Sequence, residues 1–153
     1  MTRALAAILI LGASCIEPPK QNRAAIYLEG LQDIWRWDSS KGAVGDPSYE
    51  GFFALEPTDS VPCLIRGLSD LAPTKIDDQI HPPPLVGDIC FFMLLKLFNL
   101  APKDFDAQGV WVLKHESDPI YAVRLDEAGV RLRVAEKFRK LATERGWFEE
   151  PAQ

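Results

Sequence analysis

The sequence predicts a mainly α-helical protein, a small domain of four to five helices joined by long loops rich in proline and glycine. Apolar residues recur at helical spacing in four segments. Hydrophobic residues make up 47% of the 153, enough for a core without metal or disulfide. Twelve prolines and ten glycines separate the helices. We expect a signal peptide over residues 1–14, a tether over 15–21, one helical domain over 22–148 and a tail over 149–153.

Two of the four segments lie in the first half of the chain. Apolar residues three and four positions apart predict a helix over residues 22–37. The following residues 38–49 are rich in Ser, Gly and Asp and predict a loop, and the aromatic residues of 50–55 are expected to touch the core. A shorter helix is predicted from Ser60, a favourable N-cap, to about Ser69.

The next segment contains the most apolar stretch of the chain. Residues 70–84 include a run of three prolines and predict a long connection without helix. Residues 86–100 are then apolar on nearly every side, which is typical of a helix surrounded by its neighbours. We therefore expect this helix at the centre of the core. Residues 109–113 favour either a short extended piece without an evident partner or one helical turn.

Residues 127–145 form the last predicted helix, with an apolar stripe on one side and Gly146 as its stop. Glu127 and Arg131 stand four residues apart, in the order that favours an ion pair on a helix surface. The helix holds the only basic concentration in a chain of net charge −5, and we interpret it as a solvated face. Nucleic acid is not a predicted partner, because phosphate binding requires a basic footprint.

A resemblance to a known repeat covers about a quarter of the chain. Residues 61–70, VPCLIRGLSD, followed by VGDICFFMLLKLF, resemble the helix-turn-helix of a HEAT-type repeat. In such repeats a proline-initiated helix ends in a Leu-x-Asp turn, and a more apolar helix packs behind it. The connection is longer here and no second copy is present, so the resemblance implies a compact HEAT-like helix pair at the core. By fold analogy it also implies protein binding.

The N-terminus is typical of bacterial export. A positive charge at Arg3 precedes the apolar run of residues 4–11, which is too short to span a bilayer as a helix. Small residues before Cys15 resemble a lipoprotein signal, although Gly12 replaces the preferred Leu. The resemblance implies that Cys15 is lipidated and becomes the first mature residue, and Ile16 after it implies the outer membrane. The alternatives are an ordinary secretory signal or an apolar helix packed in the fold.

This N-terminus predicts a location in the bacterial cell envelope, on the periplasmic side, with membrane contact only through the lipid anchor. Such a compartment is oxidising, so a disulfide between Cys63 and Cys90 is possible. Both cysteines lie in apolar helical patterns, where free cysteine often acts as a small hydrophobic residue. We therefore favour two buried thiols.

The sequence contains no motif for catalysis, for a cofactor or for a metal. It has two histidines and lacks the paired Cys or His spacings of metal sites. The competing hypothesis is a small hydrolase or metal-dependent enzyme that uses Asp77, Asp78, His81 and Asp88. In the simpler interpretation, Asp88 stabilises the first turn of its helix.

The favoured function is therefore a non-catalytic protein that binds another protein. The predicted partner-binding surface contains five aromatic residues, Trp35, Trp37, Tyr49, Phe52 and Phe53. Trp35 and Trp37 would be about 200° apart on a helix, so one of them is expected to face outward. Exposed aromatic side chains often anchor interfaces. In the alternative interpretation, Phe52 and Phe53 fold the loop back over both tryptophans.

Overall fold

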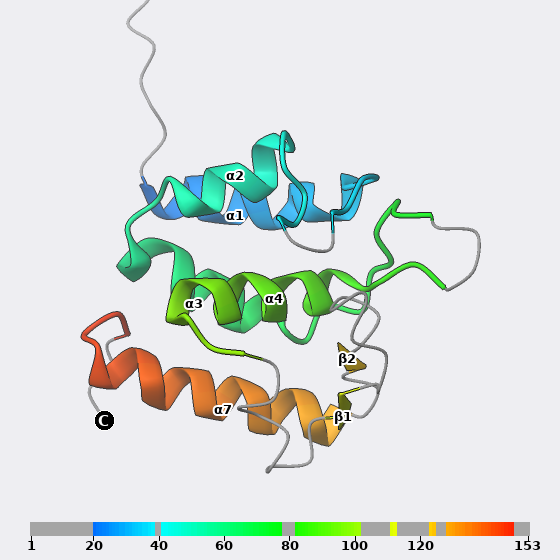
Figure 1. The fold of residues 1–153 in the computed structure, drawn as a ribbon. Coiled ribbons are helices and arrows are strands. Elements are labelled where there is room, and N and C mark those ends of the chain that lie inside the picture. Colours follow the sequence, from blue (N-terminus) through cyan, green and yellow to red (C-terminus); the bar gives the residue numbers. More distant parts are fainter. Residues whose placement is uncertain are drawn as a thin grey trace, which may run out of the picture.

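A computed structural model shows a mainly helical protein, as predicted. It describes residues 20–38, 41–77, 82–101, 111–112, 123–124 and 128–148. Within them the helices form three layers (Figure 1): α1 (Lys20–Gly30) and α2 (Pro47–Phe53) form the first, α3 (Pro57–Gly67) and α4 (Val86–Phe98) the second, and α7 (Ala128–Glu144) the third. The predicted signal peptide and Cys15 lie outside the described residues. No helix among the described residues is long and apolar enough to cross a membrane.

The first helix is shorter than predicted. It ends at Gly30, and a 3-10 turn (Leu31–Asp33) and extended backbone at Ile34 follow. The prediction of a helix to Trp37 was wrong because Ile34 and the first residue of the turn are both buried, so apolar periodicity continues where the helix does not. Trp35 and Trp37 therefore do not lie on a helix.

The second helix was not predicted, since residues 38–49 were expected to be a loop throughout. The Asp46 side chain accepts hydrogen bonds from the backbone N–H groups of Ser48, at 2.9 Å, and Tyr49, at 3.0 Å. Pro47 occupies the first helical position, where its missing N–H is not needed. In the loop before it, Gly42 has a φ of 85°, and the Tyr49 ring stands where a Cβ would lie.

Helix α3 begins three residues before the predicted N-cap Ser60, which is buried and donates to the Glu56 carbonyl at 3.2 Å. The two ends of the connection between α3 and α4 are joined by backbone hydrogen bonds. The Thr74 N–H donates to the Pro84 carbonyl, and the Val86 N–H donates to the Ala72 carbonyl, both at 2.9 Å. Eleven of the thirteen residues of α4 are buried, which confirms it as the central helix. Residues 78–81 of the connection lie outside the described residues.

Aromatic rings join α4 to both outer layers. Phe92 meets Trp37 at 6.1 Å between ring centroids on one side, and Phe138 of α7 meets Phe91 at 6.0 Å and Phe98 at 5.4 Å on the other. The apolar stripes of the three predicted helices predict one shared core of Leu64, Leu68, Phe92, Leu95, Phe138 and Leu141. The first five are buried, and Leu141 is partly buried. The predicted shared core is confirmed.

The two described cysteines are free and buried, as favoured from the sequence. The Cys63 thiol donates to the Ala24 carbonyl at 3.4 Å, which links α3 to α1. Burial raises the pKa of Cys63, and it raises the pKa of Cys90 well above the ordinary thiol value. Both therefore act as packing groups and not as reactive thiolates.

The chain after α4 contains two short strands, β1 (Trp111–Val112) and β2 (Val123–Arg124), which pair antiparallel. Of the two alternatives predicted for residues 109–113, the structure shows the extended one at residues 111–112. Strand β2 is the partner that was not evident from the sequence. Helix α7 ends as predicted: Gly146 has a φ of 70°, and Trp147 N–H returns to the Ala142 carbonyl at 2.8 Å.

Candidate binding groove between α3 and α7

A buried ion pair fixes α7 against the middle layer. Arg131 of α7 is only 5% exposed; its Nη2 lies 2.9 Å from the Asp88 carboxylate, and its Nη1 donates to the Leu68 carbonyl at 2.8 Å. The other Asp88 oxygen accepts from the Leu85 N–H at 3.0 Å. One carboxylate therefore caps the start of α4, and one guanidinium covers the end of α3, which is the favourable arrangement for both helix dipoles.

This result both confirms and corrects the sequence analysis. Asp88 does stabilise the first turn of its helix. Arg131, however, was expected on a solvated face with Glu127, which lies outside the described residues, and the structure buries it against a partner 43 residues away. The signal was present in the sequence, because Arg131 lies four residues before Ala135 and seven before Phe138, on the apolar stripe of α7.

The close approach of these groups depends on Gly87. A Cβ at this position would meet the Arg131 guanidinium, and it would lie 2.5 Å from the Leu68 carbonyl oxygen and 2.9 Å from that of Asp70. The Gly87 N–H also donates to the Asp70 carbonyl at 3.0 Å. The absence of a side chain at Gly87 therefore allows α3, α4 and α7 to meet here.

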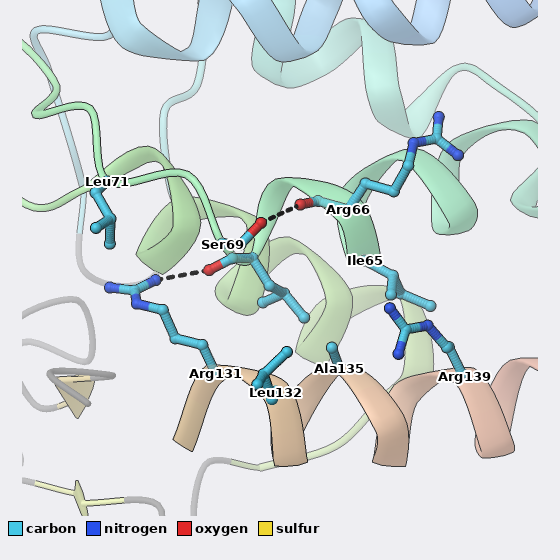
Figure 2. A pocket seen from close by; sticks show the side chains of 9 residues that line it. Ile65, Arg66, Ser69, Leu71, Arg131, Leu132, Ala135 and Arg139 are labelled. Atoms are coloured by element: carbon cyan, nitrogen blue, oxygen red, sulfur yellow. Dashed lines mark hydrogen bonds between the residues drawn. The ribbon is translucent and has the colours of Figure 1, made fainter. Parts of the chain in front are cut away.

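A groove of about 550 Å³ lies beside the ion pair, between the end of α3 and α7 (Figure 2). Its apolar lining comes from both helices and from the start of the connection: Ile65, Leu68, Leu71, Leu132 and Ala135. Polar side chains complete the rim: Arg66, Ser69, Arg131 and Arg139. An apolar surface with a few polar groups at its edge is the usual form of a ligand site.

Two leucines of the groove are unusually open to solvent. Leu71 is 63% exposed and Leu132 is 60% exposed, although large aliphatic side chains generally pack inside a domain of this size. They come from opposite walls of the same hollow. Because two exposed apolar side chains share one groove, this surface is a better candidate for binding than a single exposed leucine.

The charge of the groove is positive in an acidic protein. Helix α7 carries five Lys/Arg and two Asp/Glu, a net charge of +3, whereas the remainder has twelve Lys/Arg and twenty Asp/Glu, net −8. None of the nine lining residues is acidic. The groove therefore lies against the basic helix of a chain that is otherwise strongly acidic.

The three arginines of the rim are not equivalent. The charge of Arg131 is compensated by Asp88. The Arg66 side chain runs away from α7, whereas the exposed Arg139 lies across the groove from Ile65 (Figure 2). Within the described part of the chain, Arg139 forms no ion pair. Arg139 is therefore the cation that the groove offers to a ligand.

The five aromatic residues predicted to bind a partner are divided between core and surface. Trp35 is 60% exposed and Phe53 is 38% exposed, but Tyr49 and Phe52 are buried and Trp37 packs against the core. Tyr49 and Phe52 are therefore not surface anchors. They were expected at the surface because residues 38–49 were predicted to be a loop, whereas α2 turns both rings inward.

The acidic cluster of the competing hypothesis is not assembled among the described residues. Both oxygens of Asp88 are held by Arg131 and Leu85, and Asp77 is exposed. Asp78 and His81 lie outside the described residues. Across the described ranges, no three His, Cys, Asp or Glu side chains are grouped as a metal site requires.

Comparison with known proteins adds no relative: no protein-family model matches the chain, and no curated protein or solved structure is significantly similar to it.

Proposed function

We propose that this chain is a non-catalytic protein of the bacterial cell envelope that binds another protein, and that the groove between α3 and α7 receives an apolar segment of that partner. One observation carries the proposal. Leu71 and Leu132, each at least 60% exposed, face one groove from opposite walls. Burying exposed leucines under a partner is the main source of affinity that this surface offers.

The groove is suited to binding because its walls are held in place before a partner arrives. Arg131 ties α7 to the end of α3 through a carbonyl and a carboxylate. Burying one leucine side chain completely contributes about 1.5 to 3 kcal/mol. Leu71 and Leu132 are 63% and 60% exposed, so covering both contributes about two thirds of twice that value, part of the roughly 8 kcal/mol of a micromolar complex when little free energy is lost in ordering the site.

Capture from envelope extracts tests the proposal. The wild-type chain, Leu132→Asp and a control, Val44→Asp, are immobilised; Val44 is 61% exposed and is not part of the groove. We expect one protein that is retained by the wild type and the control and is lost with Leu132→Asp. Equal retention by all three would contradict the proposed groove. Thermal unfolding of each variant confirms that the folds are intact.

The location in the envelope has its own test. The apolar run of residues 4–11 and the small residues before Cys15 support export and lipidation. Replacing the cysteine, Cys15→Ala, should move the protein from the membrane fraction to the soluble fraction. Unchanged membrane association, or a mature protein that retains Met1, would contradict this part of the proposal.

Trp35 is a second candidate contact for the partner. Trp35 is 60% exposed, and the Arg36 guanidinium lies 4.1 Å from the centre of its ring. A large ring held in one orientation by an arginine is a common form of interface anchor. If this contact contributes, Trp35→Ala should weaken retention of the same partner without lowering thermal stability.

A further inference from the structure

We infer that the occupant of the groove is an acidic amphipathic segment of a protein, with aliphatic side chains on the apolar floor and a carboxylate at Arg139. This inference rests on the proposed function and specifies the chemistry of the partner. It is carried by the spacing of the groove residues along α7 and by the unpaired charge at one end of the groove.

The groove side of α7 presents apolar groups followed by one cation. Leu132, Ala135 and Arg139 stand at i, i+3 and i+7, so they form one row along the helix. Seven residues correspond to about 10 Å of helix rise. A matching segment therefore places its carboxylate about two helical turns from the aliphatic side chain that covers Leu132.

The charges around the groove require this acid. A neutral or basic segment lying over Arg139 would remove water from the guanidinium and give it no partner, which is unfavourable. A carboxylate would replace that water with a charge-assisted pair, for which the planar guanidinium is well suited. Because the remainder of the chain is net −8, the basic helix α7 is also the face toward which an acidic partner is steered.

A fatty acid also combines an apolar body with a carboxylate, but the shape of the groove favours a protein. Sites for small molecules usually enclose 70–90% of the ligand. Leu71 and Leu132 remain at least 60% exposed, so the groove is open along its mouth. A bound acyl chain would leave both leucine side chains partly exposed to solvent, whereas a protein segment would cover them with its own surface.

Selection from a phage-displayed library of random 12-residue peptides tests the inference on the purified mature chain. We expect the enriched peptides to have net negative charge and aliphatic residues at helical spacing. In fluorescence polarisation, Leu132→Asp should abolish their binding, and Arg139→Glu should weaken it roughly tenfold or more. The matched control is Arg133→Glu, which carries the same charge change on α7 outside the groove and should leave binding unchanged.

The outcomes separate this inference from the proposed function. Enriched peptides that are neutral or basic, yet lose binding with Leu132→Asp, would overturn the acidic partner and keep the groove. Peptide binding that is indifferent to Leu132→Asp would overturn both. Displacement of the peptides by dodecanoate at lower concentration than unlabelled peptide would overturn the inference in favour of an anionic lipid. If Arg139→Glu and Arg133→Glu weaken peptide binding equally, the attraction comes from the net charge of α7 and not from Arg139. That result would also contradict the inference.

Discussion

The two faces of the middle layer are closed in different ways. On the side of α1 and α2, aromatic rings meet at the interface: Trp37 packs on Phe92 of α4 at 6.1 Å and on Tyr49 of α2 at 5.7 Å between ring centroids. On the side of α7, rings pack at its C-terminal half, where Phe138 and Trp147 meet Phe98, and the start of the helix is held by the buried pair of Arg131 and Asp88. We call the first face sealed because its aromatic rings pack on one another; the second face leaves a groove.

The difference shows how a binding surface can be left open without loss of position. Close-packed rings fix two helices by removing the space between them. A guanidinium that reaches a carbonyl and a carboxylate fixes a helix through directed bonds at one point, so the neighbouring space remains free. The charged contact at Arg131 therefore holds α7 while Leu71 and Leu132 stay available to a partner.

The largest effect is expected at the charged contact. Asp88→Ala leaves Arg131 buried without its carboxylate, and it should lower the free energy of unfolding by about 3 to 5 kcal/mol in urea denaturation. The double variant Asp88→Ala/Arg131→Leu removes both charges and should lose less than the sum of the two single variants. A loss below about 1 kcal/mol for Asp88→Ala would show that the pair does not hold this face.

On the sealed face, Phe92→Ala is expected to lower the free energy of unfolding by about 3 kcal/mol. This is the low end of the usual range, because the ring is 7% exposed and not completely enclosed. Its contact with Trp37 would be lost. If urea denaturation gives a loss below about 1 kcal/mol, the aromatic seal is not what stabilises this side.

Gly87 tests how closely the three helices must approach at the ion pair. Gly87→Ala should lower stability by about 1 to 3 kcal/mol, because the new methyl group collides with backbone carbonyls. The control is Gly129→Ala in α7, where the nearest group is 3.5 Å from the added carbon. There the better helix former should stabilise the protein by up to about 1 kcal/mol. If Gly87→Ala and Gly129→Ala change the midpoint of thermal unfolding equally, α3, α4 and α7 do not approach closely at Gly87.

The sealed face also predicts a dependence on alkaline pH. Burial raises the pKa of Tyr49 from 10.0 to about 12. The unfolded chain therefore releases this proton first, so the stabilisation is complete below pH 10 and is lost as the pH rises toward 12. Tyr49→Phe should lose stability less steeply than the wild type over this interval. Parallel curves for the two proteins would place the Tyr49 hydroxyl in water.

The smallest effect is expected at Trp37. Its Nε1 is buried and has no hydrogen-bond partner among the described residues. Trp37→Phe removes this unsatisfied donor while keeping an aromatic ring in the seal, so stability should change by less than about 1 kcal/mol. Trp37→Ala should lose clearly more. Similar losses for both variants would mean that the indole nitrogen is satisfied in solution.

The two longest helices and the core were predicted from the sequence because their apolar periodicity is strong. Helices α4 and α7 lie within two residues of their expected bounds, and the core around Leu64, Phe92 and Phe138 was recognised. The end of α1 was not predicted correctly, because the buried Ile34 continues the apolar pattern beyond Gly30, where the helix ends. Helix α2 was missed because seven residues are too few for periodicity, and only the pair Asp46 and Pro47 marked its start.

The groove was beyond prediction from the sequence. Its floor is formed by residues of α3 and α7 that are far apart in the chain, and its width depends on how Arg131 meets Asp88. Local patterns report which face of a helix is apolar but not how near two helices approach. The exposed position of Leu132 likewise follows from the rotation of α7 that buries Arg131.

Helix α7 is held at both of its ends by arginine. Arg131 reaches the carbonyl of Leu68 near the start of the helix, and just after its end Arg145 donates to the carbonyl of Phe98 at 3.1 Å. Two attachments, one near each end of α7, restrict rotation of the helix about either of them, so we expect the spacing of the groove walls to be preserved. Association should then proceed as the docking of two ready surfaces, at about 10⁵ to 10⁷ M⁻¹s⁻¹, and differences in affinity among partners should appear in their dissociation rates.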